Sequence, residues 1–355
     1  MSRGTPPTEG PVVLGILYPA AWAGDAATFA RLVDATRAVD PRLEIVVEPY
    51  EEGQHLRTLR GTPAGAAEAR ALVPTITDAQ RAAFARVHGV VAIDLPFDVA
   101  ELAPNLGWVQ GVGAGYGQLL SAGLADAGIR FTNAAGVNAV GIAEFVIGRI
   151  LAERKQFGDL ARSQAAHDWR PVYGTELAGS TVGLLGLGAI QTAVARRLAA
   201  FDVEVLACRR SARPGDVAPD VAAVFPATDL HAMLGRCDTI VAAVPETPET
   251  VGLMDATAFA AMRPGSFFVN VGRGTLCDEA ALIANLESGH LRGAALDVTS
   301  VEPLPPEHPL WDAPNLALSY HCSSAPSALF ENLHRLWNAN IRSWLDGEPL
   351  TNEVL

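Results

Sequence analysis

Three ionisable residues near the end of the chain each follow a short apolar segment of the kind that forms a buried strand. They are Arg273, Glu302 and His321. If these segments are parallel strands of one sheet, their carboxyl ends lie along one edge, where open α/β sheets bind ligands. The sequence therefore predicts that a guanidinium, a carboxylate and an imidazole meet in one site.

This set of groups suits the reduction of a 2-keto acid, which needs a hydride, a proton and a cation for the substrate carboxylate. His321 can donate the proton because imidazole titrates near neutrality, and a hydrogen bond to Glu302 would raise its pKa. Arg273 can hold the carboxylate and carbonyl oxygens in a fork. Singly, each residue has an ordinary interpretation, as a surface arginine, a turn cap and a core histidine. Their combination with a nucleotide loop favours an active site.

A glycine-rich loop supplies that nucleotide signal, because a strand-like segment runs into GLGAIQ, which starts at Gly186, and then into a helix. Gly186 would make the tight turn, and Gly188 would let the backbone approach a pyrophosphate at the helix N-terminus. Gln191 replaces the third glycine of the dinucleotide fingerprint, so we expect the helix to sit slightly displaced. The alternative is an ordinary glycine turn.

The end of the next strand decides which nicotinamide cofactor the loop would take. An enzyme that uses NAD carries an acidic residue there for the ribose 2′-hydroxyl. This chain has Arg209, Arg210 and Ser211 instead. Two cations and a hydroxyl suit a 2′-phosphate, so the sequence predicts NADP as the preferred cofactor and NAD as a second choice. Two solvated surface arginines are the alternative.

Short apolar segments alternate with amphipathic ones along most of the chain, which is typical of parallel sheets covered by helices. The segment 51–75 has no clear period and is either a loop over a site or a poorly patterned helix. We expect strands at 12–19, 43–50, 89–96, 106–113, 130–135, 181–186, 203–208, 239–244, 266–271, 293–298 and 316–320. We expect helices at 25–39, 139–168, 189–200, 229–235, 255–262, 278–287 and 325–346.

The predicted fold class is α/β, with one domain inserted into another. A Rossmann domain with a doubly wound parallel sheet would occupy 137–322 and bind NAD(P). It would interrupt a smaller, flavodoxin-like α/β substrate domain formed by 1–136 and 323–355. We expect the last helix to pack on the first domain, and a cleft to lie between the two domains.

Composition excludes several classes of protein. The net charge of -13 disfavours binding to nucleic acid or to anionic membranes, and no apolar run reaches the roughly 20 residues that span a bilayer. The start of the chain lacks the apolar stretch of a signal peptide, and the four cysteines form no CxxC pair, so we expect a cytoplasmic protein with reduced thiols. No metal site is expected, because the other histidines lack the spacing of metal ligands.

Four segments carry a resemblance to a known family: LLGLGAI, FFVNVGRGTLCDEAALIANLESGHLRGAALDV, VEPLPPEHPLW and LSYHCSS. From about residue 90 to 345 the chain resembles the D-isomer-specific 2-hydroxyacid dehydrogenases. The resemblance implies catalytic roles for Arg273, Glu302 and His321, the set reached above from the residues. It also implies homodimers joined through the cofactor domain and its long linking helix.

The resemblance assigns further contacts. Asp297 would bind the nicotinamide carboxamide, and backbone groups of Ala114 and Gly115, in the loop that starts at Gly113, would hold the substrate carboxylate. A plain glycine turn is the alternative for that loop. Further cofactor contacts are implied for Ala189, Ile190, Pro245, Thr250 and Val271. The chain departs from the family pattern at Gln191, at Tyr320, where proline is usual, and at Gly117, where aspartate is common.

Several readings of function stay open. Glu302 argues against formate dehydrogenases, which resemble this fold but carry glutamine there. The chain ends too soon after His321 for the regulatory domain of many phosphoglycerate dehydrogenases. Arg209 and Arg210 resemble the pattern of NADPH-preferring glyoxylate and hydroxypyruvate reductases, which are our first choice. The main alternative is a cofactor-sensing binding protein of dehydrogenase fold, and another is a dehydrogenase that has lost activity.

Overall fold

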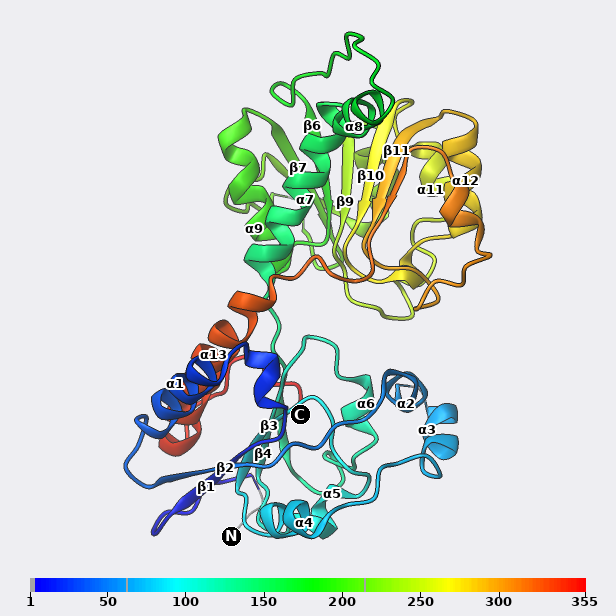
Figure 1. Cartoon of the computed structure of the whole chain (residues 1–355). Coiled ribbons are helices and arrows are strands. Elements are labelled where there is room, and N and C mark those ends of the chain that lie inside the picture. Colours follow the sequence, from blue (N-terminus) through cyan, green and yellow to red (C-terminus); the bar gives the residue numbers. More distant parts are fainter. Residues whose placement is uncertain (1–3, 62, 214) are drawn as a thin grey trace. The chain divides into compact units, whose positions relative to one another are not determined.

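The computed structural model describes residues 4–61, 63–213 and 215–355. Contacts within the chain divide it into two compact units (Figure 1). The terminal unit comprises the chain up to Val137 and Pro326–Leu355, and the central unit comprises Asn138–Ala325. Each unit is described by itself.

The central unit is built on a seven-stranded parallel sheet with the order β12-β11-β10-β9-β6-β7-β8. Side chains alternate between its faces, so that Val182 and Leu184 join one apolar cluster and Leu185 joins the other. Helices α7 and α9 cover the first face, and α10, α11 and α12 cover the second. This double winding and strand order confirm the predicted Rossmann fold, with one additional strand.

The strands of the central unit are β6 (Thr181–Leu185), β7 (Glu204–Arg209), β8 (Ala223–Pro226), β9 (Thr239–Ala242), β10 (Ser266–Asn270), β11 (Leu291–Leu296) and β12 (Leu316–Leu318). Its α-helices are α7 (Ala139–Arg154), α8 (Phe157–Ala165), α9 (Ala189–Leu198), α10 (Leu230–Leu234), α11 (Ala256–Ala261) and α12 (Glu279–Glu287). Strand β8 was not predicted. It is short, half-buried and paired with β7 at the sheet edge, where Pro226 is tolerated although it cannot donate a hydrogen bond.

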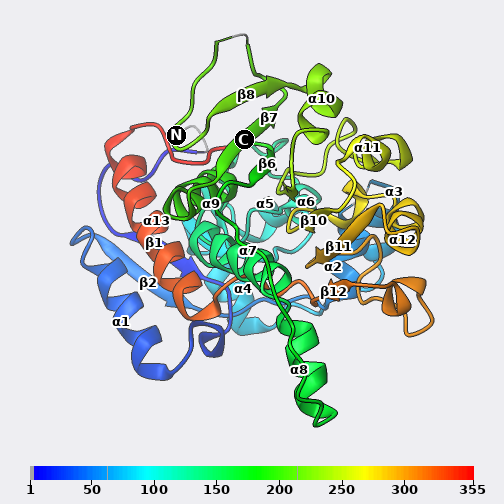
Figure 2. The same cartoon turned by 90° about the horizontal axis from the view of Figure 1, so that it is seen from above.

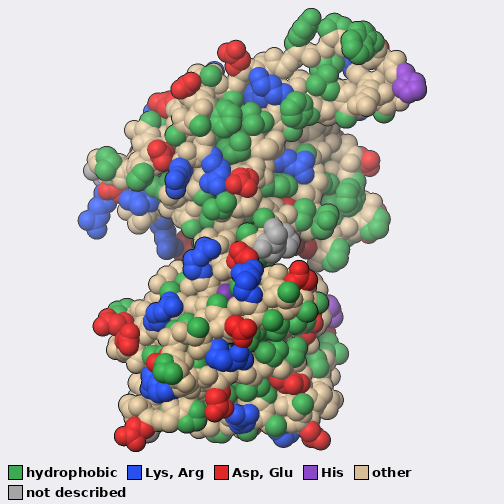
Figure 3. Space-filling model, turned by 60° about the vertical axis from the view of Figure 1, so that its left-hand side comes forward, with side chains coloured by type: hydrophobic (Ala, Val, Ile, Leu, Met, Phe, Trp, Pro, Cys, Tyr) green, Lys and Arg blue, Asp and Glu red, His purple; other side chains and the backbone are tan. Residues whose placement is uncertain are grey.

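The predicted helix 139–168 is wrong, because two helices occupy this segment. Gln156 adopts a left-handed conformation with φ 57°, and its side chain donates a hydrogen bond to the carbonyl of Glu153. The break carries no glycine or proline that would have signalled it. Helix α8 therefore extends away from the body of the central unit (Figure 2). We call α8 and the loop that follows it, residues 157–173, the projecting arm. Hydrophobic side chains gather on this arm (Figure 3).

The terminal unit has a five-stranded parallel sheet with the order β2-β1-β3-β4-β5, which confirms the flavodoxin-like arrangement. Helices α1 and α13 lie side by side on one face, where Trp337, Ile341 and Trp344 pack against β1 and Trp108, as expected for the last helix (Figure 1). The strands are β1 (Val12–Ile16), β2 (Leu43–Val47), β3 (Gly89–Ala92), β4 (Trp108–Gly111) and β5 (Arg130–Thr132), and the two helices are Ala26–Arg37 and Pro326–Asp346.

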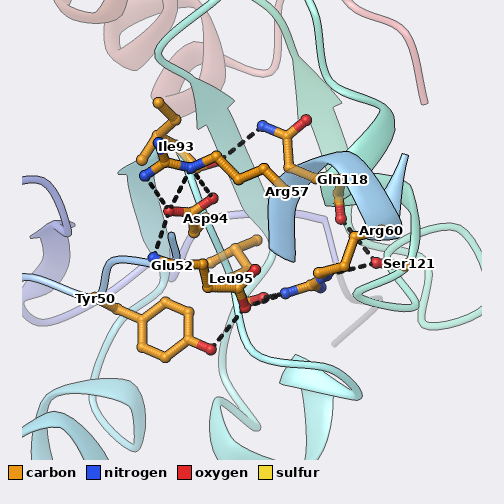
Figure 4. Close-up of polar contacts among 9 residues, drawn as sticks. All are labelled: Tyr50, Glu52, Arg57, Arg60, Ile93, Asp94, Leu95, Gln118 and Ser121. Atoms are coloured by element: carbon orange, nitrogen blue, oxygen red, sulfur yellow. Dashed lines mark hydrogen bonds and ion pairs between the residues drawn. The ribbon is translucent and has the colours of Figure 1, made fainter. Parts of the chain in front are cut away.

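The segment 51–75, left open by the sequence, contains two helices, α2 (Gln54–Arg60) and α3 (Pro63–Ala69). Charged side chains anchor α2, as Figure 4 shows. Arg60 is buried, pairs with Glu52 and donates to the carbonyl of Leu95 at 2.6 Å. Arg57 donates to the buried carboxylate of Asp94 at 2.7 Å. An apolar period is weak here because the helix is held by guanidinium groups rather than by a hydrophobic stripe.

Within the described residues, no helix has both the length and the apolar composition that crossing a membrane requires. All four cysteines are free thiols, and three of them are buried.

A buried histidine links α13 to α1 and to the segment that follows β1. The side chain of His334 is 2% exposed, and its Nε2 lies 2.5 Å from the hydroxyl of Tyr18. Its Nδ1 lies 3.1 Å from Oγ1 of Thr36. Burial lowers the pKa of His334 to about 4, so the folded protein holds this imidazole neutral at physiological pH.

We predict that His334 makes the terminal unit less stable in mild acid. The unfolded chain takes up a proton near the ordinary histidine pKa and the folded chain only near pH 4, so stability falls as the pH decreases between these values. Between pH 7.5 and 5 this group alone should lower the free energy of unfolding by about 2 kcal/mol. Urea unfolding followed by tryptophan fluorescence measures it.

The matched variants are His334→Gln and His55→Gln, the second at an exposed position of the same unit. His334→Gln should be less stable at pH 7.5 but show a flatter dependence on pH, whereas His55→Gln should behave as the wild type. Equal pH dependence in all three proteins would show that His334 is not the titrating group.

Candidate functional site

The imidazole of His321 and the carboxylate of Glu302 are hydrogen-bonded, with Nδ1 2.9 Å from Oε2. The backbone N–H of Thr299 donates to the other carboxylate oxygen at 3.1 Å. The hydrogen bond with Glu302 raises the pKa of His321, although partial burial opposes this. Burial acts to raise the pKa of Glu302, but the hydrogen bonds from His321 and Thr299 outweigh it and lower that pKa. The geometry therefore favours the charged forms of both groups.

The buried side chain of Asp297 holds the turn that carries His321. Its Oδ1 accepts hydrogen bonds from the hydroxyl of Ser319 at 2.7 Å and the N–H of Cys322 at 3.0 Å, and its Oδ2 accepts one from the N–H of Ser323 at 3.0 Å. Its backbone carbonyl accepts the N–H of His321 at 2.8 Å. His321 itself has φ 55°, which is uncommon for a residue other than glycine. No pattern in the sequence predicted this anchoring role of Asp297.

Arg273 follows β10 in a turn braced by Asn270, whose side-chain amide donates to the carbonyl of Arg273 at 2.9 Å. The next residue must be glycine, because a Cβ on Gly274 would lie 1.9 Å from the carbonyl carbon of Thr299. This close approach packs the turn of Arg273 against the loop of Glu302. The positive charge of Arg273 acts to lower the pKa of His321, so the two groups lie within electrostatic range. The three residues that the sequence singled out thus come together.

The glycine loop has the conformation that a pyrophosphate site needs. Gly186 has φ 89°, and a Cβ there would lie 2.9 Å from the side chain of Val244. Gly188 is the N-cap of α9, makes no side-chain capping bond, and leaves open space where a Cβ would be. The first N–H groups of a helix lack partners within it, so those of Ala189 and Ile190 fit an anionic ligand.

Gln191, the departure from the fingerprint, lies buried beneath this loop. Its side-chain amide donates to the carbonyl of Leu185 at 3.1 Å and to that of Val241 at 2.6 Å. These bonds tie the first turn of α9 to the ends of β6 and β9. Two hydrogen bonds therefore connect helix and sheet where the fingerprint glycine would allow close packing.

A cavity of about 260 Å³ lies beside the glycine loop. Five of the predicted cofactor residues line it: Gly186, Arg209, Arg210, Pro245 and Thr250. Most of the other lining side chains are apolar, as an adenine ring requires: Leu185, Cys208, Ala227, Leu230, Val244 and Leu253. Ser211 is exposed and Val271 is buried in the core, and neither lines this cavity. The loop and the cavity together fit a dinucleotide.

The predicted substrate loop belongs to the terminal unit and follows β4. Ala114 and Gly115 are exposed, and the carbonyl of Ala114 accepts a hydrogen bond from the side chain of Asn133 at 3.3 Å. Gly117 permits a close contact, because a Cβ there would lie 3.3 Å from Cα of Gly61 at the end of α2. A glycine in place of the aspartate that is common in the family therefore has a packing reason here.

In the part of the chain that the structure describes, no group of three or more histidine, cysteine or acidic side chains could hold a metal ion.

A family model described as "D-isomer specific 2-hydroxyacid dehydrogenase, NAD binding domain" matches residues 147–323. A glyoxylate reductase of Thermofilum pendens is 34% identical over 260 residues, which cover 71% of this chain and 75% of that protein. A D-3-phosphoglycerate dehydrogenase of Mycobacterium leprae is 35% identical over 259 residues, 72% of this chain but 48% of that longer protein.

Two solved structures match almost the whole chain. A D-isomer specific 2-hydroxyacid dehydrogenase of Xanthobacter autotrophicus, in complex with NADPH and MES, has a TM-score of 0.75 and 28% identity and covers 98% of each chain. An NADPH-dependent glyoxylate/hydroxypyruvate reductase of Sinorhizobium meliloti has a TM-score of 0.71 and 27% identity, also over 98% of each chain. Motifs, fold and relatives agree: this chain belongs to the D-isomer specific 2-hydroxyacid dehydrogenase family and is an NAD(P)-dependent oxidoreductase.

Proposed function

We propose that this enzyme reduces a small 2-keto acid, with glyoxylate or hydroxypyruvate as the first choice and NADPH preferred over NADH. The observation that carries the proposal is the hydrogen-bonded pair of His321 and Glu302, packed beside Arg273 at the carboxyl edge of a Rossmann sheet. We assign the cofactor domain to residues 137–322 and the substrate domain to 1–136 and 323–355.

In this proposal the protonated imidazole of His321 donates a proton to the carbonyl oxygen of the substrate. Glu302 keeps that imidazole charged, and Arg273 binds the substrate carboxylate and polarises the carbonyl group. A bound nicotinamide would supply the hydride for carbon 2. The keto acid, NADPH and one proton thus give the hydroxy acid and NADP⁺. In the reverse reaction, neutral His321 takes the proton from the hydroxyl group.

The proposed cofactor contacts follow the geometry described above. The N–H groups of Ala189 and Ile190 would hold the pyrophosphate, and the apolar cavity would hold adenine. Arg209, Arg210 and Ser211 would bind the 2′-phosphate. Asp297 remains our choice for the nicotinamide carboxamide, as an additional contact of a carboxylate that already accepts three hydrogen bonds. Both solved structures named above come from NADPH-associated proteins, which supports the choice of cofactor.

The proposed substrate is supported by the glyoxylate reductase relatives and by the loop that starts at Gly113. We keep the exposed backbone of Ala114 and Gly115 as proposed contacts of the substrate carboxylate. Phosphoglycerate dehydrogenases are among the relatives, so a phosphorylated keto acid belongs in any test of specificity. Four free thiols support our placement of the protein in a reducing compartment such as the cytoplasm.

We predict that the protein oxidises NADPH in the presence of glyoxylate or hydroxypyruvate, as measured by NADPH absorbance. His321→Ala should lower kcat by about a hundredfold or more, because it removes the proton donor. His231→Ala, at an exposed position of the same unit, is the control and should retain wild-type activity. If no keto acid from a panel that includes pyruvate and 3-phosphohydroxypyruvate is reduced, while NADPH still binds, the result contradicts the proposal and favours a non-catalytic role.

We predict that Glu302→Gln narrows the pH range of the reduction reaction. Removing the carboxylate lowers the pKa of His321, and activity is lost as the pH rises through that pKa, so the basic limb of kcat/KM should move to lower pH. The control is Glu307→Gln, at an exposed position of the same loop. A basic limb that stays at the same pH in Glu302→Gln would refute the role of Glu302.

We predict a homodimer that forms through the projecting arm around α8. The arm exposes Phe157, Leu160, Trp169 and Tyr173, the last two by 103% and 87%. Such an apolar patch is typical of a protein interface. In light scattering after gel filtration, Leu160→Glu combined with Trp169→Ser should give monomers. Val217→Glu, at an equally exposed apolar position outside the arm, should leave the mass unchanged. A monomeric wild type contradicts this prediction.

A further inference from the structure

Arg209, which lines the adenosine cavity, already has an anionic partner within the protein. Its Nη2 donates to Oδ2 of Asp216 at 2.6 Å. The same oxygen accepts the backbone N–H of Arg213 at 3.1 Å, which fixes the carboxylate in the loop between β7 and β8. The structure thus places a carboxylate against one of the two cations that we assign to the 2′-phosphate.

The ion pair between Arg209 and Asp216 is partly shielded from solvent. The side chains of Arg209 and Asp216 are only 36% and 26% exposed, so solvent and salt screen their attraction less than on an open surface. The hydrogen bonds from Arg209 and from the N–H of Arg213 lower the pKa of Asp216. Asp216 therefore stays ionised at any pH at which the enzyme would be assayed.

Arg209 also has a hydrogen-bond donor that no described group of the protein accepts. Its Nε is buried and has no hydrogen-bond partner among the described residues. A guanidinium binds a phosphate best through two parallel N–H groups. Asp216 takes Nη2 and leaves Nε unpaired, so a phosphate that engages the fork of Arg209 must compete with Asp216.

Arg210 serves as a comparison for Arg209, because its ion pair with Glu249 is longer and more exposed. Nη1 of Arg210 lies 3.6 Å from Glu249, and these side chains are 78% and 63% exposed. An exposed pair at that distance contributes little. The competition is therefore concentrated at Arg209.

We propose that Asp216 is a specificity-determining residue for the cofactor, on the basis of the proposed 2′-phosphate site. Asp216 competes with the 2′-phosphate of NADPH for Arg209 and repels that dianion at short range. NADH carries no such phosphate and escapes this penalty. Asp216 therefore weakens the binding of NADPH but not that of NADH, and so reduces the preference of the enzyme for NADPH.

The test is the replacement Asp216→Asn, which removes the charge and keeps the size of the side chain. The dissociation constants of NADPH and NADH are measured on the full chain by cofactor fluorescence. Adenosine 2′,5′-bisphosphate and adenosine 5′-monophosphate serve as probes that differ only in the 2′-phosphate. We expect Asp216→Asn to bind NADPH and the bisphosphate about tenfold more tightly.

Three comparisons make the result decisive. NADH and the monophosphate should bind Asp216→Asn as they bind the wild type, which also shows that the cavity is intact. Glu249→Gln, the matched control at Arg210, should change the binding of NADPH by less than about twofold. Arg209→Ala should weaken the binding of NADPH and leave that of NADH unchanged.

The two levels of the proposal can fail separately. If Arg209→Ala weakens NADPH binding but Asp216→Asn leaves it unchanged, the inference about Asp216 is overturned and the 2′-phosphate site stands. If Arg209→Ala leaves NADPH binding unchanged, the proposed 2′-phosphate site is wrong and the inference falls with it.

Discussion

The site depends first on the buried carboxylate of Asp297 at the end of β11. A carboxylate removed from water is costly unless hydrogen bonds compensate it, and three donors of the turn 319–323 do so. Because those donors lie in the turn, satisfying the charge also fixes the turn. His321 is thereby held at φ 55°, a conformation that costs energy outside glycine, with its ring against Glu302.

A second constraint acts between the loops that follow β10 and β11. Gly274 lets the turn of Arg273 touch the backbone of Thr299, and the N–H of Thr299 orients Glu302. Any side chain on Gly274 would drive these loops apart. Strand order brings the three loops to one edge of the sheet, and these short-range contacts then set the positions of the side chains. The carboxylate of Asp297 and the small size of Gly274 thus position three side chains that are distant in sequence.

The sequence predicted the features that depend on periodic burial, and it missed those that depend on individual polar contacts. Apolar segments located most strands, and strand ends located Arg273, Glu302 and His321. Helix α2 was not predicted because Arg60 and Arg57 anchor it in place of an apolar stripe. The break before α8 was not predicted because Gln156 is neither glycine nor proline. The pairing of Asp216 with Arg209 depends on the path of a loop, which residue types alone do not determine.

The two ends of the proposed cofactor site are built on different principles. At the proposed pyrophosphate end, backbone N–H groups would bind the ligand, so a change of side chain is tolerated if the helix keeps its place. Gln191 illustrates this, since its amide bonds to Leu185 and Val241 hold α9 on the sheet without the fingerprint glycine. At the proposed adenosine end, charged side chains on a surface loop would determine whether a 2′-phosphate binds. On this proposal, substitutions at Arg209 and Asp216 would change cofactor preference, while the edge of the sheet that carries Arg273, Glu302 and His321, held by Asp297 and Gly274, would stay unaltered.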